Sequence, residues 1–228
     1  MATTGTTAFD LDVREISEEA FERIDIDKQR LTGDHMRSAR RSMNLMFRSW
    51  DNFSGVPWKA SRASQALTAS SATVTMPADL IDITSASLRR SNIDVDMVRI
   101  SESDYQSIPD KTTEGRPDRY FMHKLSPAIL YLWQTPENST DTFEYWGIRR
   151  IEDISAAVNN TDTVQRWLDA VCANLTLRLF DKLPFERRIP QIRQDIKIEA
   201  IESLDLARDA DRDRSSVVII PSYRNQSI

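Results

Sequence analysis

One stretch of the chain carries apolar residues on two opposite helical faces, and this limits the possible folds more than any other feature. The stretch spans residues 162–183. Its main stripe follows the i, i+3, i+4, i+7 spacing of a helix and comprises Val164, Trp167, Leu168, Val171, Cys172, Leu175 and Leu179. The opposite side carries Ala170, Ala173, Leu177 and Phe180. A surface helix needs one apolar face, so two faces predict a central helix that is packed on both sides.

The limits of this helix also have candidate signals. Asp162 with Gln165 three residues later predicts a capping box at the start, in which each side chain binds a free backbone N–H. Pro184 predicts the end, because proline removes a backbone donor and clashes with the preceding turn.

Three further helices are expected around the central one. Asp12 and Glu15 predict a capped helix that runs to about Ile26, and a second helix is expected over about 34–51. A fourth is expected over about 185–212, with the apolar stripe Ile189, Ile192, Ile196, Ala200, Leu204 and Ala207. Ile198 and Ile201 lie off that stripe, which leaves two readings open: a subunit interface, or a contact with the β-rich domain of the same chain.

Between the helical pairs, serine, threonine, proline and glycine punctuate short β-rich runs. The expected strands are Ala72–Met76, Ile83–Arg89, Asp96–Ile100, Arg119–His123, Ile129–Gln134 and Thr142–Ile148. Residues 128–133 are apolar throughout, which predicts a strand buried on both faces. A short helical segment is expected over 101–108.

The sequence therefore predicts an α+β chain, mainly a bundle of about four helices with an inserted β-rich domain. We expect a helical pair over residues 1–60, the β-rich domain over 61–155, a second helical pair over 156–212 and an extended C-terminal tail over 213–228.

Candidate catalytic and metal-binding motifs are missing from the sequence. The two histidines, His35 and His123, are not part of an H-E-x-x-H pattern, and no phosphate-binding glycine loop or G-x-S-x-G elbow is present. The single cysteine, Cys172, lies on the apolar face of the central helix, where a small buried hydrophobe is expected. We therefore expect neither an enzyme nor a bound cofactor or metal. No apolar run reaches about 18 residues, so no membrane span is expected.

Charged residues collect on two helix faces. Glu15, Glu18, Glu19 and Glu22 lie on one face of the first helix, and Arg37, Arg41 and Arg48 line up on the second. The arginine face has two readings: a DNA-binding or regulatory module that contacts phosphates, or a face that is solvated or paired with acidic residues. The chain carries a formal net charge of −5, which favours the second reading.

An ordered set of stretches resembles a known family along nearly the whole chain. These stretches are Phe9–Ile24, Leu31–Trp50, Met76–Ile83, Arg99–Pro109, Gly115–Tyr120, Leu130–Pro136, Ile148–Asp153, Arg166–Ala173 and Asp211–Pro221. In this order and spacing the chain resembles the head-to-tail adaptor proteins of short-tailed bacteriophages, which are also called tail tubular or head-completion proteins. The order of the set carries the resemblance, since no single motif is diagnostic.

The resemblance implies a structural virion protein at the neck, between head and tail, assembled in the host bacterial cytoplasm. Such adaptors form a twelve-fold ring beneath the portal protein, continue the DNA channel and present a platform for the tail nozzle protein. The genomic double-stranded DNA would pass without sequence-specific binding. A helical bundle with an inserted β-rich domain is also what the family implies.

Candidate interface residues follow from this resemblance together with the charge pattern. A ring needs two different complementary faces on each subunit, and the candidates are Glu15, Glu18, Glu19, Glu22, Arg37, Arg41, Arg48, Ile198 and Ile201. The family's C-terminal segments reach the portal. That role fits the strand-like apolar run near the C-terminus, so the predicted portal-binding residues are Val217, Val218, Ile219, Ile220 and Tyr223.

Overall fold

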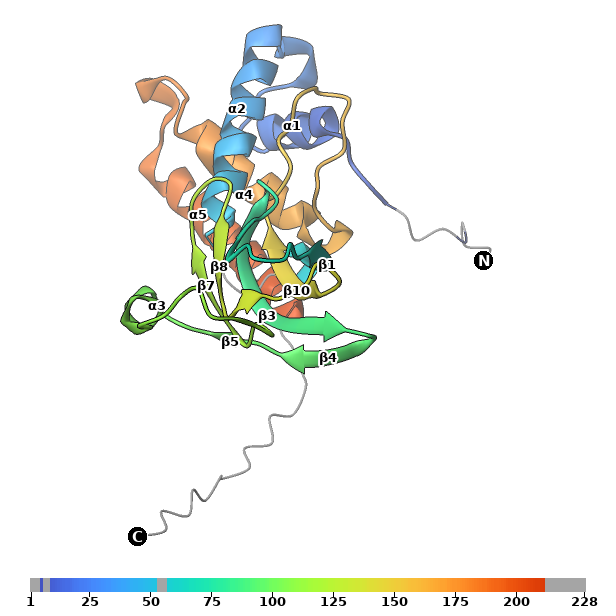
Figure 1. Ribbon diagram of the computed structural model, residues 1–228. Helices are drawn as coiled ribbons and strands as arrows, with labels where there is room; N and C mark the ends of the chain where they lie inside the picture. The colour runs from blue at the N-terminus through green and yellow to red at the C-terminus, as the bar shows by residue number, and fades with distance from the viewer. Residues whose placement is uncertain (1–4, 6–8, 53–56, 212–228) are drawn as a thin grey trace.

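The computed structural model describes residues 5, 9–52 and 57–211, which form an α+β protein (Figure 1). The α-helices are α1 (Val13–Glu22), α2 (Gly33–Trp50), α3 (Glu102–Ser107), α4 (Leu168–Phe180) and α5 (Pro190–Ala210). Short 3-10 turns precede or follow them at η1 (Lys28–Arg30), η2 (Pro57–Lys59), η3 (Gln165–Trp167) and η4 (Phe185–Arg187).

The strands form two four-stranded sheets and one small pair. The first sheet has the order β1 (Ala60–Ala66), β10 (Thr142–Arg149), β3 (Leu80–Arg90) and β4 (Ile93–Asp96). The second has the order β2 (Thr73–Thr75), β8 (Ile129–Trp133), β7 (Arg119–His123) and β5 (Val98–Arg99). The pair is β6 (Glu114–Gly115) with β9 (Thr135–Pro136).

The two larger sheets share one apolar core. Alternate residues of β7 and β8 are buried, as the period of two in a strand requires. Tyr120 of β7 meets Phe143 of β10 edge-on, with ring centroids 5.6 Å apart. The burial of β3 and β10 side chains in the same cluster places the sheets face to face.

A second apolar core lies between the helices, with α4 at its centre. The helices α1, α2 and α5 all pack against α4. Residues from both of its faces are buried, including Val171 and Ala173. The prediction of a helix packed on both sides is therefore confirmed.

The prediction of a mainly helical bundle was wrong. Among the described residues, five α-helices accompany ten strands in three sheets, and the strands build a core of their own. The helices are not aligned as in a bundle either, since α1 lies across α2 (Figure 1). The sequence reading missed β1 and β4 because both strands are largely exposed and carry no clear apolar alternation.

Three local predictions also need correction. Helix α4 begins only at Leu168, because the Asp162 carboxylate binds Arg149 instead of capping a helix. Ile189 and Ile192 are exposed, so the buried stripe of α5 starts later, at Ile196. Strand β8 alternates between buried and partly exposed residues and is not buried on both faces.

Candidate functional site

The four glutamates that the sequence places on one face lie on α1, and three of them are engaged within the chain. Glu15 forms a capping box with Asp12. Glu18 forms ion pairs with Arg14 and Lys28, and Glu19 forms one with Arg23. Glu22 is exposed and has no ion pair among the described residues. Among the described residues, only Glu18 and Glu19 of this face therefore have cationic partners.

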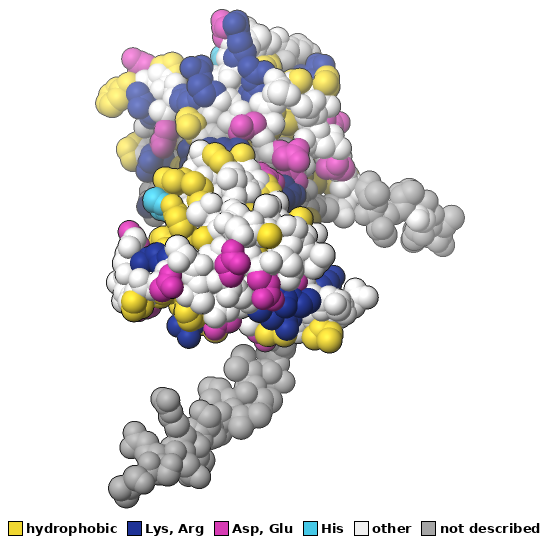
Figure 2. Space-filling model, viewed as in Figure 1, with side chains coloured by type: hydrophobic (Ala, Val, Ile, Leu, Met, Phe, Trp, Pro, Cys, Tyr) yellow, Lys and Arg dark blue, Asp and Glu magenta, His cyan; other side chains and the backbone are white. Residues whose placement is uncertain are grey.

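The three arginines of α2 that the sequence predicts at an interface have different surroundings. Arg37 forms an exposed ion pair with Asp34, which is a weak interaction in water. Arg48 turns toward the end of the helix, where its guanidinium binds three acceptors. Arg41 is exposed and has no ion pair in the part of the chain that the structure describes. Figure 2 shows Lys and Arg atoms gathered over the part of the molecule that α2 occupies in Figure 1.

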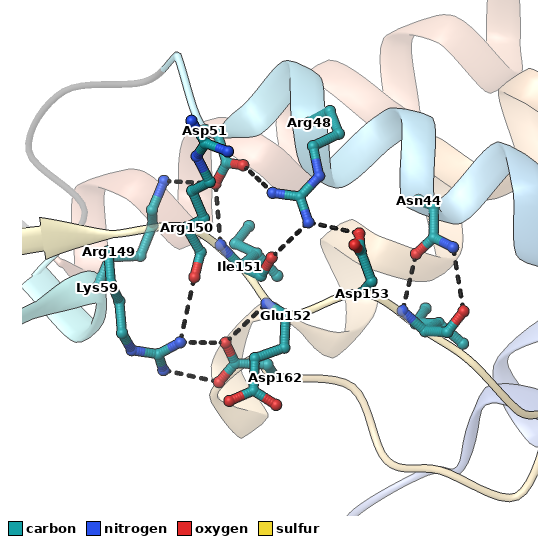
Figure 3. Close-up of polar contacts among 11 residues, drawn as sticks. Asn44, Arg48, Asp51, Lys59, Arg149, Arg150, Ile151, Glu152, Asp153 and Asp162 are labelled. Atoms are coloured by element: carbon teal, nitrogen blue, oxygen red, sulfur yellow. Dashed lines mark hydrogen bonds and ion pairs between the residues drawn. The ribbon is translucent and has the colours of Figure 1, made fainter. Parts of the chain in front are cut away.

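The Asp51 carboxylate, just after α2, binds the segment before the first strand, β1, and the segment after the last strand, β10 (Figure 3). It thereby joins the layer of helices to the layer of strands. It accepts from Arg48 Nη1 at 2.7 Å, from Lys59 Nζ at 3.0 Å and from the Ile151 backbone N–H at 3.0 Å. Lys59 immediately precedes β1, and Ile151 follows β10 by two residues. One carboxylate at the end of α2 therefore fixes the places where the chain enters and leaves the strand layer.

Further contacts hold the segment that follows β10 against α2. Asn44 donates to the Ile154 carbonyl at 3.1 Å and accepts from the Ile154 N–H at 2.9 Å. Arg48 Nη2 donates to the Ile151 carbonyl at 2.9 Å and to the exposed Asp153 carboxylate. These contacts engage the Arg48 guanidinium within the chain, although its side chain is still 37% exposed, so its place at an interface stays a prediction.

Arg149 and Asp162 form a two-pronged ion pair beside this junction (Figure 3). Burial disfavours the charged carboxylate, but the hydrogen bonds from Arg149 and from the Glu152 N–H outweigh this effect and lower the pKa of Asp162. The same pairing raises the pKa of Arg149. Both groups are therefore charged near neutral pH.

We expect the lowered pKa of Asp162 to make the fold sensitive to acid. The unfolded chain binds a proton to this carboxylate near pH 4, whereas the folded chain does so only at lower pH. The stabilisation is thus present above about pH 4 and is lost as the pH falls through the folded-state pKa. Urea unfolding between about pH 3 and 7 measures it, and Asp162→Asn should flatten the profile. An identical pH profile for the variant would contradict this role.

The two isoleucines that lie off the buried stripe of α5 face away from the helical core. Ile198 is 43% exposed and Ile201 is 49% exposed. Neither belongs to the apolar core of the strands or is among the partly buried residues packed against it. Their place in an assembly stays a prediction.

The predicted portal-binding residues Val217, Val218, Ile219, Ile220 and Tyr223 lie outside the described residues. The structure does describe Asp211, where this segment attaches. Its buried carboxylate accepts from Trp167 Nε1 at 2.7 Å and from Arg166. The C-terminal segment thus begins at a point that is fixed to the start of α4.

The single cysteine and the two histidines each have a structural role within the fold. Burial raises the pKa of the Cys172 thiol to about 11, so this thiol is protonated near neutral pH. His35 completes the cap of α2 with Thr32, and His123 stacks on Phe121. Among residues 5, 9–52 and 57–211, no group of three or more His, Cys, Asp or Glu could hold a metal ion. No helix in the same part of the chain has the length and apolar character for a membrane span.

Two features of these surfaces escaped the sequence reading. Lys59 is 1% exposed, although a lone lysine gives no sign of burial. Leu45 is 59% exposed on the arginine face of α2, and its spacing of four from Arg41 could have shown that it shares this face.

The sequence of the chain matches one known protein family over most of its length. The family model for the SU10 adaptor protein matches residues 7–221. This range includes all the elements described above and reaches into the C-terminal segment. A search of curated proteins found no match.

Proposed function

Because the chain belongs to the SU10 adaptor protein family, a family of structural phage adaptors, we propose that it forms the ring between portal and tail nozzle. The observation that carries this proposal is the family match, which extends over residues 7–221 and so takes in both layers and the apolar C-terminal run. In this role the ring, with twelve subunits, sits at the neck of the virion and continues the DNA channel. It assembles in the host cytoplasm.

The charges of the chain support the passage of DNA without tight binding. The net charge is −5, and two of the four arginines on α2, Arg37 and Arg48, have acidic partners within the chain. Strong binding to DNA usually needs several cations that neutralise phosphates together. The alternative of a DNA-binding module on α2 therefore has less support than a channel component.

The C-terminal segment is the proposed contact with the portal protein. Val217–Ile220 is an apolar, β-branched run, which is the type of segment that adds a strand to the exposed edge of a sheet. Its attachment point at Asp211 is held by Trp167 and Arg166. A fixed attachment point limits the volume that the segment can search and so favours docking.

Deleting residues 216–228 should abolish co-sedimentation with portal rings from the same phage. The helical circular-dichroism signal should stay unchanged, because the helical core ends before this segment. The matched control deletes only residues 222–228, beyond the family match. It keeps Val217–Ile220 but removes Tyr223, so we expect weaker docking that is not abolished. Full docking of the longer deletion would contradict the proposed contact.

A further inference from the structure

Two exposed helix faces of this chain are complementary in charge and both contain apolar side chains. The α2 face consists of Arg37, Arg41 and Leu45, which follow one another at a spacing of four. The α5 face consists of Ile198, Ile201, Glu202 and Asp205, in which each isoleucine has a carboxylate one turn later. Residues spaced four apart lie on one side of a helix, so each set forms a continuous surface.

The α2 face carries positive charge that the chain itself does not balance. Arg41 has no ion pair among the described residues, and Arg37 has only the exposed Asp34. The pKa of Lys182 is lowered, first by burial and then by repulsion from the charge of Arg41. The positive charge of Arg41 thus acts on a neighbouring cation of the same chain. Together with Arg40, Asn44 and Arg48, the three residues of the face line an open hollow. Leu45 therefore offers an apolar contact within a basic surface.

The α5 face has the opposite character. Glu202 and Asp205 are exposed and have no ion pair in the described part of the chain. Lys197 borders the face one turn before Ile201 and Gln194 one turn before Ile198, but the two carboxylates are the charged groups within the face. Two isoleucines that are nearly half exposed on one surface helix point to a contact that a partner covers.

The two faces lie on opposite sides of the helical layer. Helix α4 packs between α2 and α5. The residues of α2 and α5 that are buried toward this core, such as Met43 and Ala200, lie on the sides opposite the two exposed faces. A contact between the faces within one chain is therefore impossible, whereas a second copy can bring its α5 face to the α2 face of the first.

We propose that the α2 face of one copy binds the α5 face of a second copy, with Leu45 packed against Ile198 and Ile201 and the arginines opposite Glu202 and Asp205. The contact is heterologous: each copy binds one neighbour through its α2 face and the other neighbour through its α5 face. Such contacts can continue around a ring. The inference rests on the proposed function, in which copies of the chain associate, and adds which faces of the copies meet. It takes the place of the acidic face of α1, on which Glu18 and Glu19 are already paired with cations of the same chain.

Cysteine crosslinking in purified phage particles tests which faces meet. We expect Leu45→Cys combined with Ile198→Cys, treated with a short bismaleimide, to give a ladder of multimers on a denaturing gel. Either substitution alone should leave monomers, and Cys172 should not react because it is buried. Particles that contain the double variant but yield monomers would overturn the inference, and so would dimers from Leu45→Cys alone. Absence of the unmodified chain from the particles would instead refute the proposed function.

Charge reversal provides a second, independent test on the purified full-length chain. Arg37→Glu with Arg41→Glu should weaken self-association at least about ten-fold, as should Glu202→Arg with Asp205→Arg. All four substitutions together should restore it, because every heterologous contact then regains opposite charges. Glu22→Arg on α1 is the matched control and should have no effect. Rescue of the α2 reversal by Glu22→Arg would overturn the inference in favour of α1.

The same variants separate a protein partner from DNA. If the α2 reversal removed low-salt binding to duplex DNA and left self-association intact, the α2 face would be a phosphate-binding surface and the inference would be wrong. If the purified chain sediments as a monomer at every concentration, the same charge variants are scored by their incorporation into particles. The expected order is unchanged: loss for each reversal and recovery for the combination.

Discussion

Trp167→Ala should lower the free energy of unfolding by about 3–5 kcal/mol, the range for truncating a large buried aromatic side chain. Trp167 is 1% exposed. Its ring meets Trp50 and Trp58 edge-on, at centroid distances of 5.5 and 6.0 Å. Truncation leaves a cavity at the centre of the helical core, and it also removes the indole donor from the buried Asp211 carboxylate. Urea unfolding followed by circular dichroism measures the loss.

Two control substitutions separate the causes of this loss. Trp167→Phe keeps most of the ring but removes the hydrogen bond to Asp211, so we expect a smaller loss of about 1–3 kcal/mol. Trp146→Ala removes a tryptophan that is 48% exposed, and should cost about 1 kcal/mol or less. If Trp167→Ala unfolded at the same urea concentration as Trp146→Ala, Trp167 would not hold the core together.

Asp51→Ala should also cost about 3–5 kcal/mol, because it removes one partner of a buried ion pair. The Lys59 side chain is 1% exposed and would be left as an unpaired cation. Arg48 and the Ile151 N–H would lose the same acceptor. The effect should therefore appear in urea unfolding as a loss far above that of an ordinary surface substitution.

Asp153→Ala is the matched control, since Asp153 also binds Arg48 but is exposed. Exposed ion pairs contribute little, so the expected cost is below about 1 kcal/mol. Adding Lys59→Met to Asp51→Ala should recover part of the loss, because the uncompensated charge is then gone. Equal losses for Asp51→Ala and Asp153→Ala would contradict the role of Asp51 as the buried junction.

The helix faces could be predicted from sequence because residues three or four apart in the sequence always lie on the same side of a helix. The spacing of Val13, Ile16 and Ala20 indicates the buried side of α1, and the Asp12–Glu15 capping box forms as predicted. The cap at Asp162 failed because a distant residue competes for its carboxylate. Arg149 lies on a strand that the sequence could not place beside it.

The strand layer was harder to predict, because the burial of a strand depends on what covers each face. Strand β1 pairs along all seven of its residues with β10, yet its sequence, ASRASQA, contains no large apolar residue. Strand β8 is apolar throughout, but only one face lies in the core. On the other face Tyr131 contacts Tyr105 of α3 and Phe121 of β7, which cover it in part.

The charged faces show the same limit for the candidate site. Sequence spacing places Arg37, Arg41 and Arg48 along one helix, but it cannot say which charge is already paired. The pairing of Arg48 with Asp51 and Asp153 depends on how the chain returns from the strand layer. The exposure of Ile198 and Ile201 likewise follows from the position of α4, which only the folded chain defines.

The anchoring of Asp211 beside Trp167 determines where a mechanical load enters the subunit. A pull on the C-terminal segment enters α5 through the main chain and is also passed through the Asp211 carboxylate to Arg166 and Trp167, just before α4. In a subunit that its neighbours hold through α2 and α5, the load then runs from helix to helix across the centre of the molecule. If the C-terminal segment binds the portal as proposed, tension there would enter the subunit through the helices and not through the sheets.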